Sequence, residues 1–143
     1  MALLPDVRAM MSEDDMVHAE NWRKVVATKN CGLKLWAGSW YMTASHTITP
    51  AIPIAKCLNG WLLHFVEYRN GALWNANNNY VCIPKNHVTD AHGTGVGISL
   101  ALPWDTASYK YLYVTGTTIT GHANNDKATG NANKMMLTEV YGW

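Results

Sequence analysis

The pattern of hydrophobic and polar positions divides the chain near residue 30. In the stretch SEDDMVHAENWRKVVATKNCG, side chains with apolar parts recur at helical spacing, at Met16, Ala19, Trp22 or Arg23, and Val26. Ser12 stands in the position of an N-cap, acidic residues fill the first turn and lysines lie toward the end, an order that suits the helix dipole. NCG at 30–32 is typical of a helix end. The pattern predicts one helix over residues 13–28.

This helix needs a partner. Its apolar stripe is too narrow and too short for an independent fold, because isolated helices of this length are marginal in water. We expect it to pack on the rest of the chain, on other copies of the chain, or on a larger assembly. ALLPDV, which precedes it, is predicted to be an exposed apolar arm. The side chains expected to make oligomer or docking contacts are Leu3, Leu4, Met16, Trp22, Val26 and, at the chain end, Trp143.

From Lys34 onward the helical period disappears. Short apolar runs alternate there with clusters rich in Gly, Asn and Pro, which include NANNN at 75–79; the runs are KLW, HTIT, WLLHFVEY, YVCI, GVGISLAL, KYLYVTG, TTIT and KMMLTEVY. Strands at this spacing predict an antiparallel β-sandwich or barrel. The chain is therefore predicted to be mainly β, with a jelly-roll-like head over residues 31–143 preceded by an arm and one α-helix over residues 1–30.

Two of these runs predict which way their side chains face. In SYKYLYV the tyrosines at 109, 111 and 113 share one face of a strand, because side chains alternate along it, and Lys110 lies with Leu112 and Val114 on the other. In WLLHFVEY both faces are apolar, so this strand is expected to lie in the middle of a sheet.

The charge balance excludes some partners. Lys and Arg number 11 and Asp and Glu 10, so the net charge is +1, and nucleic acid, which needs clustered cations, is not expected as a partner. No apolar run approaches the roughly 20 residues of a membrane helix, and no secretory signal pattern is present, so we expect no membrane insertion. Cys31, Cys57 and Cys82 lack C-x-x-C spacing and are expected to be reduced.

Candidate chemistry for catalysis is sparse. His87 and His92 flank a loop and could meet Asp90, but none of the histidines is paired at the spacing of a helical metal site. Glu67 and Glu139 lie within predicted strands, where we expect them to pair with lysines on an exposed face. No G-x-S-x-G and no cysteine nucleophile signature is present. We therefore expect no enzyme, no cofactor and no metal.

The aromatic residues remain as candidates for binding. Trp and Tyr occur seven times each and Phe once, so most rings have a polar tip and suit interfaces and sugar platforms. Trp74 in GALWNANNN and Trp104 in LPWDTASY are expected in exposed loops, where binding residues concentrate. The alternative is that each ring fastens its loop to the core. The candidate glycan-binding residues are Trp74, Asn75, Asn77, Trp104 and Asp105. The tryptophans beside strands, Trp36, Trp40 and Trp61, are expected to be structural.

The order of several motifs is similar to a known family. KLWAGSWYM, HTITP, CIPKNHV, KYLYVTGTTITGHANND and MMLTEVYGW occur in that order. Together they resemble the C-terminal β-domain of tailed-bacteriophage tail proteins of the receptor-binding, baseplate or tail-fibre class. The match covers residues 34–143 and is carried by Trp36, Gly38, Tyr41, Met42, Pro84, Lys85, Lys110, Tyr111, Tyr113, Gly121 and Asn125.

The resemblance implies a virion protein, assembled in the host cytoplasm, that forms a homotrimer and binds a host cell-surface glycan without a covalent bond. The N-terminal segment would dock to other virion proteins, and the partner on the host would be a cell-wall polysaccharide. The family domain ends a longer chain, whereas about 30 residues precede it here. A capsid head-fibre or decoration protein with a purely structural role therefore stays open, as does a small carbohydrate-binding or enzymatic domain unrelated to phages.

Overall fold

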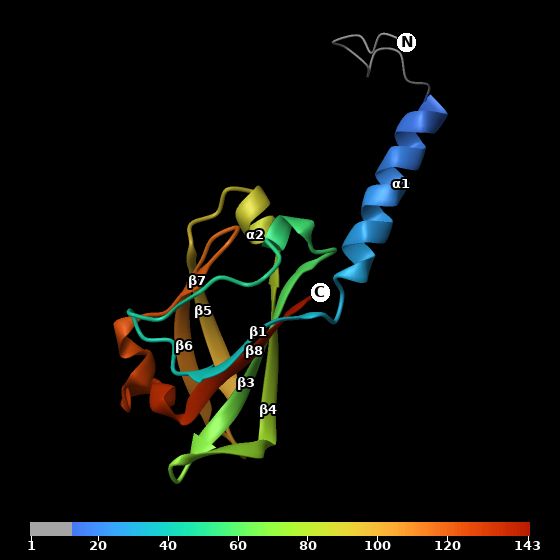
Figure 1. The fold of residues 1–143 in the computed structure, drawn as a ribbon. Helices are drawn as coiled ribbons and strands as arrows, with labels where there is room; N and C mark the ends of the chain where they lie inside the picture. Colours follow the sequence, from blue (N-terminus) through green and yellow to red (C-terminus); the bar gives the residue numbers. More distant parts are fainter. Residues whose placement is uncertain (1–12) are drawn as a thin grey trace.

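The protein is a two-layer β-sandwich preceded by a long helix. The structure, a computed structural model, describes residues 13–143, which form two four-stranded antiparallel sheets in the orders β1-β8-β3-β4 and β2-β7-β6-β5 (Figure 1). The strands are β1 (Lys34–Trp40), β2 (Thr47–Ile48), β3 (Gly60–Arg69), β4 (Ala72–Pro84), β5 (Gly95–Ala101), β6 (Ala107–Val114), β7 (Ile119–Thr120) and β8 (Met135–Gly142). The helices are α1 (Glu13–Lys29), α2 (Asn86–Thr89) and the 3-10 turns η2 (Ile54–Lys56), η3 (Ala123–Asp126) and η4 (Thr129–Lys134). The prediction of a mainly β chain with one N-terminal helix is confirmed.

The core lies between the sheets and is built from alternate strand positions. On β3, Trp61, Leu63 and Phe65 are fully buried. This strand lies between β8 and β4, as its two apolar faces predicted. The Trp61 indole donates a hydrogen bond of 3.0 Å to the carbonyl of Ile52, so its one polar atom is satisfied. Trp36 packs against the same core and, like Trp61, is structural as expected.

On β6 the predicted alternation is confirmed. Tyr109, Tyr111 and Tyr113 are exposed on the outer face, and Leu112 and Val114 are buried. Lys110 shares the inner face with these two and is only 3% exposed. A lysine here must find acceptors, because an unpaired buried ammonium costs several kcal/mol.

Three backbone carbonyls surround the Lys110 ammonium. Nζ donates to the oxygens of Tyr41 at 3.1 Å, Asn125 at 2.8 Å and Ala132 at 2.6 Å, which matches the three donors of an ammonium group. Tyr41 belongs to the connection from β1 to β2, and the other two residues belong to the connection from β7 to β8. Lys110 therefore fastens both of these sheet-to-sheet connections to β6. Burial lowers the pKa of Lys110 to about 7, and the Asp126 carboxylate acts in the opposite direction.

The Asn125 side chain extends the β6 ladder beyond β7. β7 pairs with Tyr113 and Val114. Nearer the start of β6, the Asn125 amide takes over: Oδ1 accepts from Tyr111 N at 2.9 Å, and Nδ2 donates to Tyr111 O at 2.8 Å and to Met42 O at 2.7 Å. The amide thus satisfies backbone groups that a neighbouring strand would otherwise pair with.

The segment 75–79, predicted as a break between strands, lies inside β4. Val66 on β3 faces Asn78, while the next residue, Glu67, faces Trp74. Residues 75–77 therefore form a bulge rather than a turn, and the prediction that Trp74 lies in a loop is wrong. The asparagine-rich sequence bends the strand without ending it.

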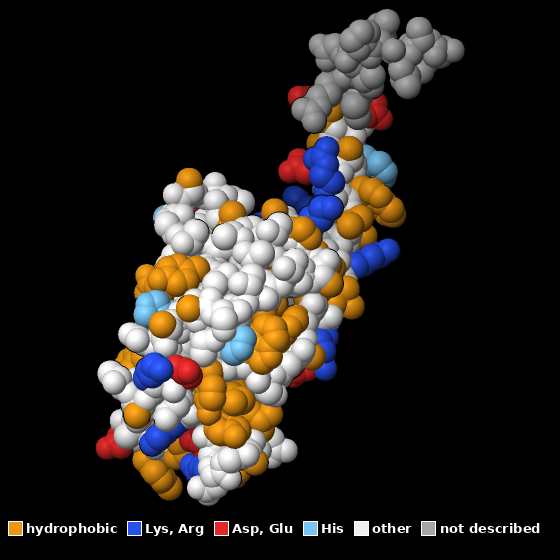
Figure 2. Space-filling view, turned by 60° about the vertical axis from the view of Figure 1, so that its left-hand side comes forward, with side chains coloured by type: hydrophobic (Ala, Val, Ile, Leu, Met, Phe, Trp, Pro, Cys, Tyr) orange, Lys and Arg blue, Asp and Glu red, His pale blue; other side chains and the backbone are white. Residues whose placement is uncertain are grey.

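The long helix α1 runs from Glu13 to Lys29, one residue beyond its predicted end, and has no buried side chain. It extends away from the sandwich (Figure 1), and hydrophobic side chains lie among charged ones along it (Figure 2). Packing on the β part, one of its three expected partners, is therefore wrong. Met16, Trp22 and Val26 are exposed, with Trp22 at 60%. Ser12, Leu3, Leu4 and the ALLPDV arm lie outside the described residues.

The buried lysine makes the stability depend on pH. Between about pH 7 and the ordinary lysine pKa of 10.5, the unfolded chain binds a proton that the folded chain has lost, so the free energy of unfolding is expected to rise with pH. Lys110→Met removes this contribution, which amounts to about 1.4 kcal/mol per pH unit at most. Urea unfolding at a series of pH values measures the slope, with the exposed Lys56→Met as control. Equal slopes for wild type and Lys110→Met would contradict the assignment.

Candidate functional site

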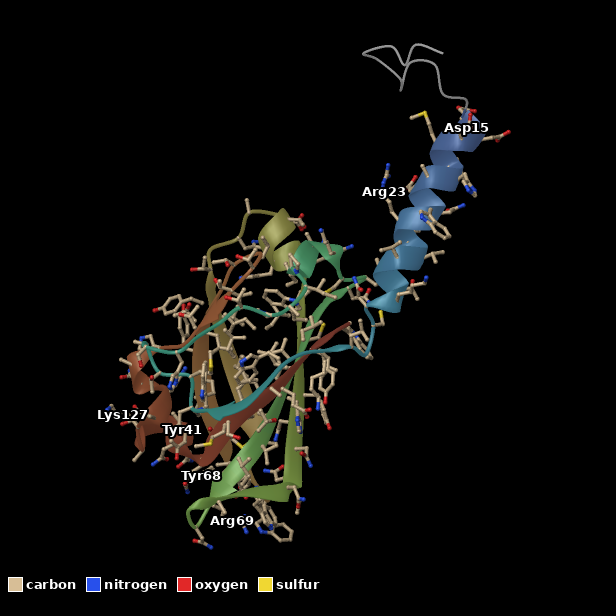
Figure 3. The ribbon with its side chains drawn as sticks, viewed as in Figure 1. Asp15, Arg23, Tyr41, Tyr68, Arg69 and Lys127 are labelled. Atoms are coloured by element: carbon tan, nitrogen blue, oxygen red, sulfur yellow. The ribbon has the colours of Figure 1, made fainter. Side chains whose placement is uncertain are left out.

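The candidate site lies at the end of the sandwich opposite α1. The β3–β4 hairpin turns there just after Arg69, and the loop from β5 to β6, residues 102–106, reaches the same end. In Figure 3, Arg69 marks this tip, far from Arg23 on α1. Near this end lie the two candidate tryptophans of the sequence, Trp74 at the start of β4 and Trp104 in the β5–β6 loop.

Trp104 has an unusual environment. It lies in a loop, as predicted, and its side chain is 99% exposed. Its backbone has φ of 73°, in the left-handed region that costs a non-glycine residue about 1–3 kcal/mol. A tryptophan that contributes no burial on a strained backbone does not stabilise the fold, so the alternative that this ring fastens its loop to the core is wrong.

Trp74 faces Trp104 across a shallow hollow. The hollow measures about 300 Å³ and is lined by Trp74, Ala76, Asn77, Pro103 and Trp104. The structure thus brings together the two rings that the sequence singled out, although 30 positions separate them. Trp74 is half-buried because the Arg69 guanidinium lies over its ring, 3.9 Å from the centroid.

The polar candidates are placed differently. Asn77 lines the hollow, but its Nδ2 already donates to Ala101 O at 2.9 Å. Asn75 lies in the bulge and its carbonyl accepts from Asn78 at 2.7 Å. Asp105 is exposed beside Trp104 without lining the hollow. Of the three, Asn77 is therefore brought into the site, whereas Asn75 and Asp105 stand outside its lining.

A second hollow, of about 420 Å³, shares Pro103 and Trp104 with the first. Its lining includes charged residues that the sequence reasoning missed, namely Glu67, Arg69 and Lys134. The expectation that Glu67 pairs with a lysine on an exposed face is wrong: its side chain is 5% exposed and pairs with Arg69 at 2.8 Å. The signal was present, because Glu67 has the same parity as the core residues Trp61, Leu63 and Phe65 on β3.

Glu139 behaves as expected. On the outer face of its sheet it pairs with Lys34, whose hydrogen bond lowers the pKa of Glu139, while Glu139 raises that of Lys34. It also accepts from His64 Nδ1 at 2.9 Å, and His64 Nε2 contacts Asn78 Oδ1 at 2.7 Å under the stacked Tyr80 ring. Both ring nitrogens of this histidine therefore contact side chains of the protein.

The tyrosine face of β6 forms a larger, open groove. It measures about 770 Å³, and its exposed rings are Tyr109, Tyr111 and Tyr113, with His122 at 5.7 Å from Tyr111. Gly97 and Ser99 on β5 also line it. This groove is a second aromatic surface against which the Trp74–Trp104 site has to be tested.

Other chemistry is limited within residues 13–143. All three cysteines are free, Cys57 buried and the other two exposed. No group of three potential ligands is arranged to hold a metal ion in this part of the chain, and the rings of His87 and His92 are 6.2 Å apart. None of the helices described here has the length and apolar character needed to span a bilayer.

Comparison with known proteins adds no family. No protein-family model matches the chain, and no curated protein and no solved structure is significantly similar to it. Function is therefore argued from the chemistry of the site, because a sandwich fold hosts many activities.

The strained backbone at Trp104 predicts that glycine at this position stabilises the protein. Trp104→Gly is expected to raise the free energy of unfolding by about 0.5–1 kcal/mol, since glycine adopts this φ without steric cost and little ring burial is lost. Trp104→Ala keeps the Cβ and is expected to give no such gain. Thermal and urea unfolding measure both variants. A large loss of stability in Trp104→Gly would mean that the ring packs against the protein in solution.

Proposed function

We propose that this protein is a bacteriophage virion protein of the tail-fibre or receptor-binding type, which binds a host cell-surface glycan at the Trp74–Trp104 end. It works without a covalent step and without a cofactor. The observation that carries the proposal is Trp104, an almost fully exposed indole on a strained backbone, facing Trp74 across a hollow.

The chemistry of this end suits a sugar. Indole rings offer flat apolar surfaces for the C–H face of a pyranose, and strain at a ligand-binding residue is retained where function requires it. Trp74 is held in place by the Arg69 guanidinium, so its ring is oriented before a ligand arrives. Asn77 also lines the hollow, and because its Nδ2 has two N–H groups, one remains for a sugar hydroxyl beside the one that Ala101 O accepts.

The opposite end suits attachment to a particle. The helix α1 exposes Met16, Trp22 and Val26 and buries none of its side chains, and a lone helix of this length is marginal in water. Packing against copies of itself in a homotrimer, as the resemblance to phage tail proteins implies, would cover these residues, and the N-terminal segment would dock to other virion proteins. Trp143, exposed at the chain end, is a further contact candidate.

The exposed helix also favours a second candidate function. A capsid head-fibre or decoration protein needs the same docking helix and uses its aromatic residues only for contact between subunits. The two functions differ in one respect, because the decoration protein binds particles and no host glycan.

Binding by the two tryptophans is tested on bacterial surface-glycan arrays and by cell-wall pull-down. Trp74→Ala and Trp104→Ala are each expected to weaken binding about tenfold or more, because an aromatic platform is removed. Tyr109→Ala in the tyrosine groove is the matched control and is expected to bind like wild type. If Tyr109→Ala alone loses binding, the glycan site lies in the tyrosine groove and not at the two tryptophans. If the wild-type protein binds phage particles but no glycan, the decoration function is correct.

Self-association through α1 is tested by the mass in solution. Sedimentation of the wild-type chain is expected to give three times the chain mass, and the double variant Met16→Glu/Val26→Glu is expected to give a monomer whose sandwich stays folded, because charges replace the apolar contact. Val17→Glu, off the predicted stripe on the same helix, serves as the control. A wild-type monomer at high concentration would contradict the trimer.

A further inference from the structure

The hollow beside Trp104 has the features of an anion site. Arg69 is fixed on two sides: Glu67 Oε2 lies 2.8 Å from its Nη2, and the Trp74 ring lies against its guanidinium. The Arg69 side chain nevertheless stays 43% exposed. An arginine that is held in place and still presents N–H groups suits bidentate recognition of a phosphate or carboxylate.

Glu67 explains why this arginine is held. Its carboxylate is 5% exposed on the core face of β3, and Oε2 accepts no hydrogen bond within the described residues. A buried carboxylate needs a compensating charge, and the ion pair with Arg69 supplies it. Glu67 is thus a positioning residue that anchors one edge of the guanidinium and leaves the remainder available.

A second cation lines the same hollow. Lys134 is exposed, and no hydrogen bond or ion pair engages it within residues 13–143. With Arg69 and Glu67 compensating each other, the lining keeps one net positive charge from Lys134. The hollow measures about 420 Å³, which lies within the usual range for small-ligand sites of roughly 300–1,000 Å³.

Trp104 joins the two hollows. It lines both the aromatic hollow, together with Trp74, and the charged hollow, together with Arg69 and Lys134. A sugar stacked on the indole would therefore carry its substituents toward the two cations.

We infer that this end of the protein selects glycans with an anionic substituent, a phosphate or a carboxylate, which binds Arg69 and Lys134 while the sugar stacks on Trp104. The inference rests on the proposed glycan-binding function and adds the charge class of the ligand. Phosphodiester polymers and uronic acid polymers share this chemistry and differ in the shape of the anionic group.

The test compares three probes with the full chain: a purified poly(glycerol phosphate) teichoic acid, polygalacturonate and the neutral polymer dextran. Titration calorimetry is expected to show binding of at least one anionic probe, weakened by added salt, and little binding of dextran. Arg69→Gln is expected to weaken binding of that probe about tenfold or more, because a charged hydrogen-bond donor is lost. Lys134→Gln is expected to weaken it less.

Two further variants separate specific recognition from general attraction. Arg69→Lys keeps the charge but not the planar fork, so it is expected to restore only part of the affinity. Lys56→Gln removes an exposed lysine that does not line the hollow and is expected to bind like wild type. An equal loss in Lys56→Gln would reduce the effect to non-specific attraction and overturn the inference.

The outcomes distinguish this inference from the proposed function. If a neutral glycan binds through Trp74 and Trp104 and Arg69→Gln leaves its affinity unchanged, the anionic selection is wrong and glycan binding stands. If the wild-type chain binds no probe and no arrayed glycan, both proposals are wrong. Circular dichroism and urea unfolding show that each variant is folded before it is titrated.

Discussion

The buried ammonium of Lys110 is the constraint on which the rest of the sandwich depends. Its three acceptor carbonyls come from Tyr41, Asn125 and Ala132, in the two connections that pass between the sheets. Asn125 adds its own amide to the edge of β6. A single strand residue therefore sets how the paths from β1 to β2 and from β7 to β8 lie over the core.

The connection held by Lys110 leads to the candidate site. The connection held by Lys110 ends at Lys134, directly before β8, and Met135 on β8 pairs with Glu67 on β3. Glu67 and Arg69 lie two positions apart on one face of β3, which brings their side chains together, and the pairing of Met135 with Glu67 places Lys134 near the same hollow. The connection that Lys110 holds therefore contributes one of the charges of this hollow, Lys134, whereas Glu67 and Arg69 are positioned by β3 itself.

The strands were predictable from sequence because alternation is a local property. The period of two in SYKYLYV placed Lys110 with Leu112 and Val114, but it could not show that three carbonyls would surround the ammonium, since their residues lie in other segments. The asparagine-rich residues 75–77 read as a turn because their composition is that of a turn, whereas pairing with β3 keeps them in a strand as a bulge. The register between strands depends on tertiary structure, so it cannot be derived from composition.

Only part of the candidate site was predictable from the sequence. Turn chemistry around Trp104 indicated an exposed ring, and that expectation rested on its own neighbours in sequence. The approach of Trp74 to Trp104, and the charges beside them, depend on how two hairpins of different sheets meet. The burial of Glu67 departs from the expectation because a carboxylate is rarely buried without a partner, and here the partner is Arg69, two positions along the same strand.

The separation of the two ends has a mechanical consequence. Tension applied between α1 and the Arg69 tip would pull β1 and β3 in opposite directions along their lengths, with β8 between them. The interstrand hydrogen bonds on both sides of β8 would then be strained together in shear instead of opening one after another. If the chain is held by α1 and binds a surface through its far end, all of these hydrogen bonds would therefore resist a detaching force together.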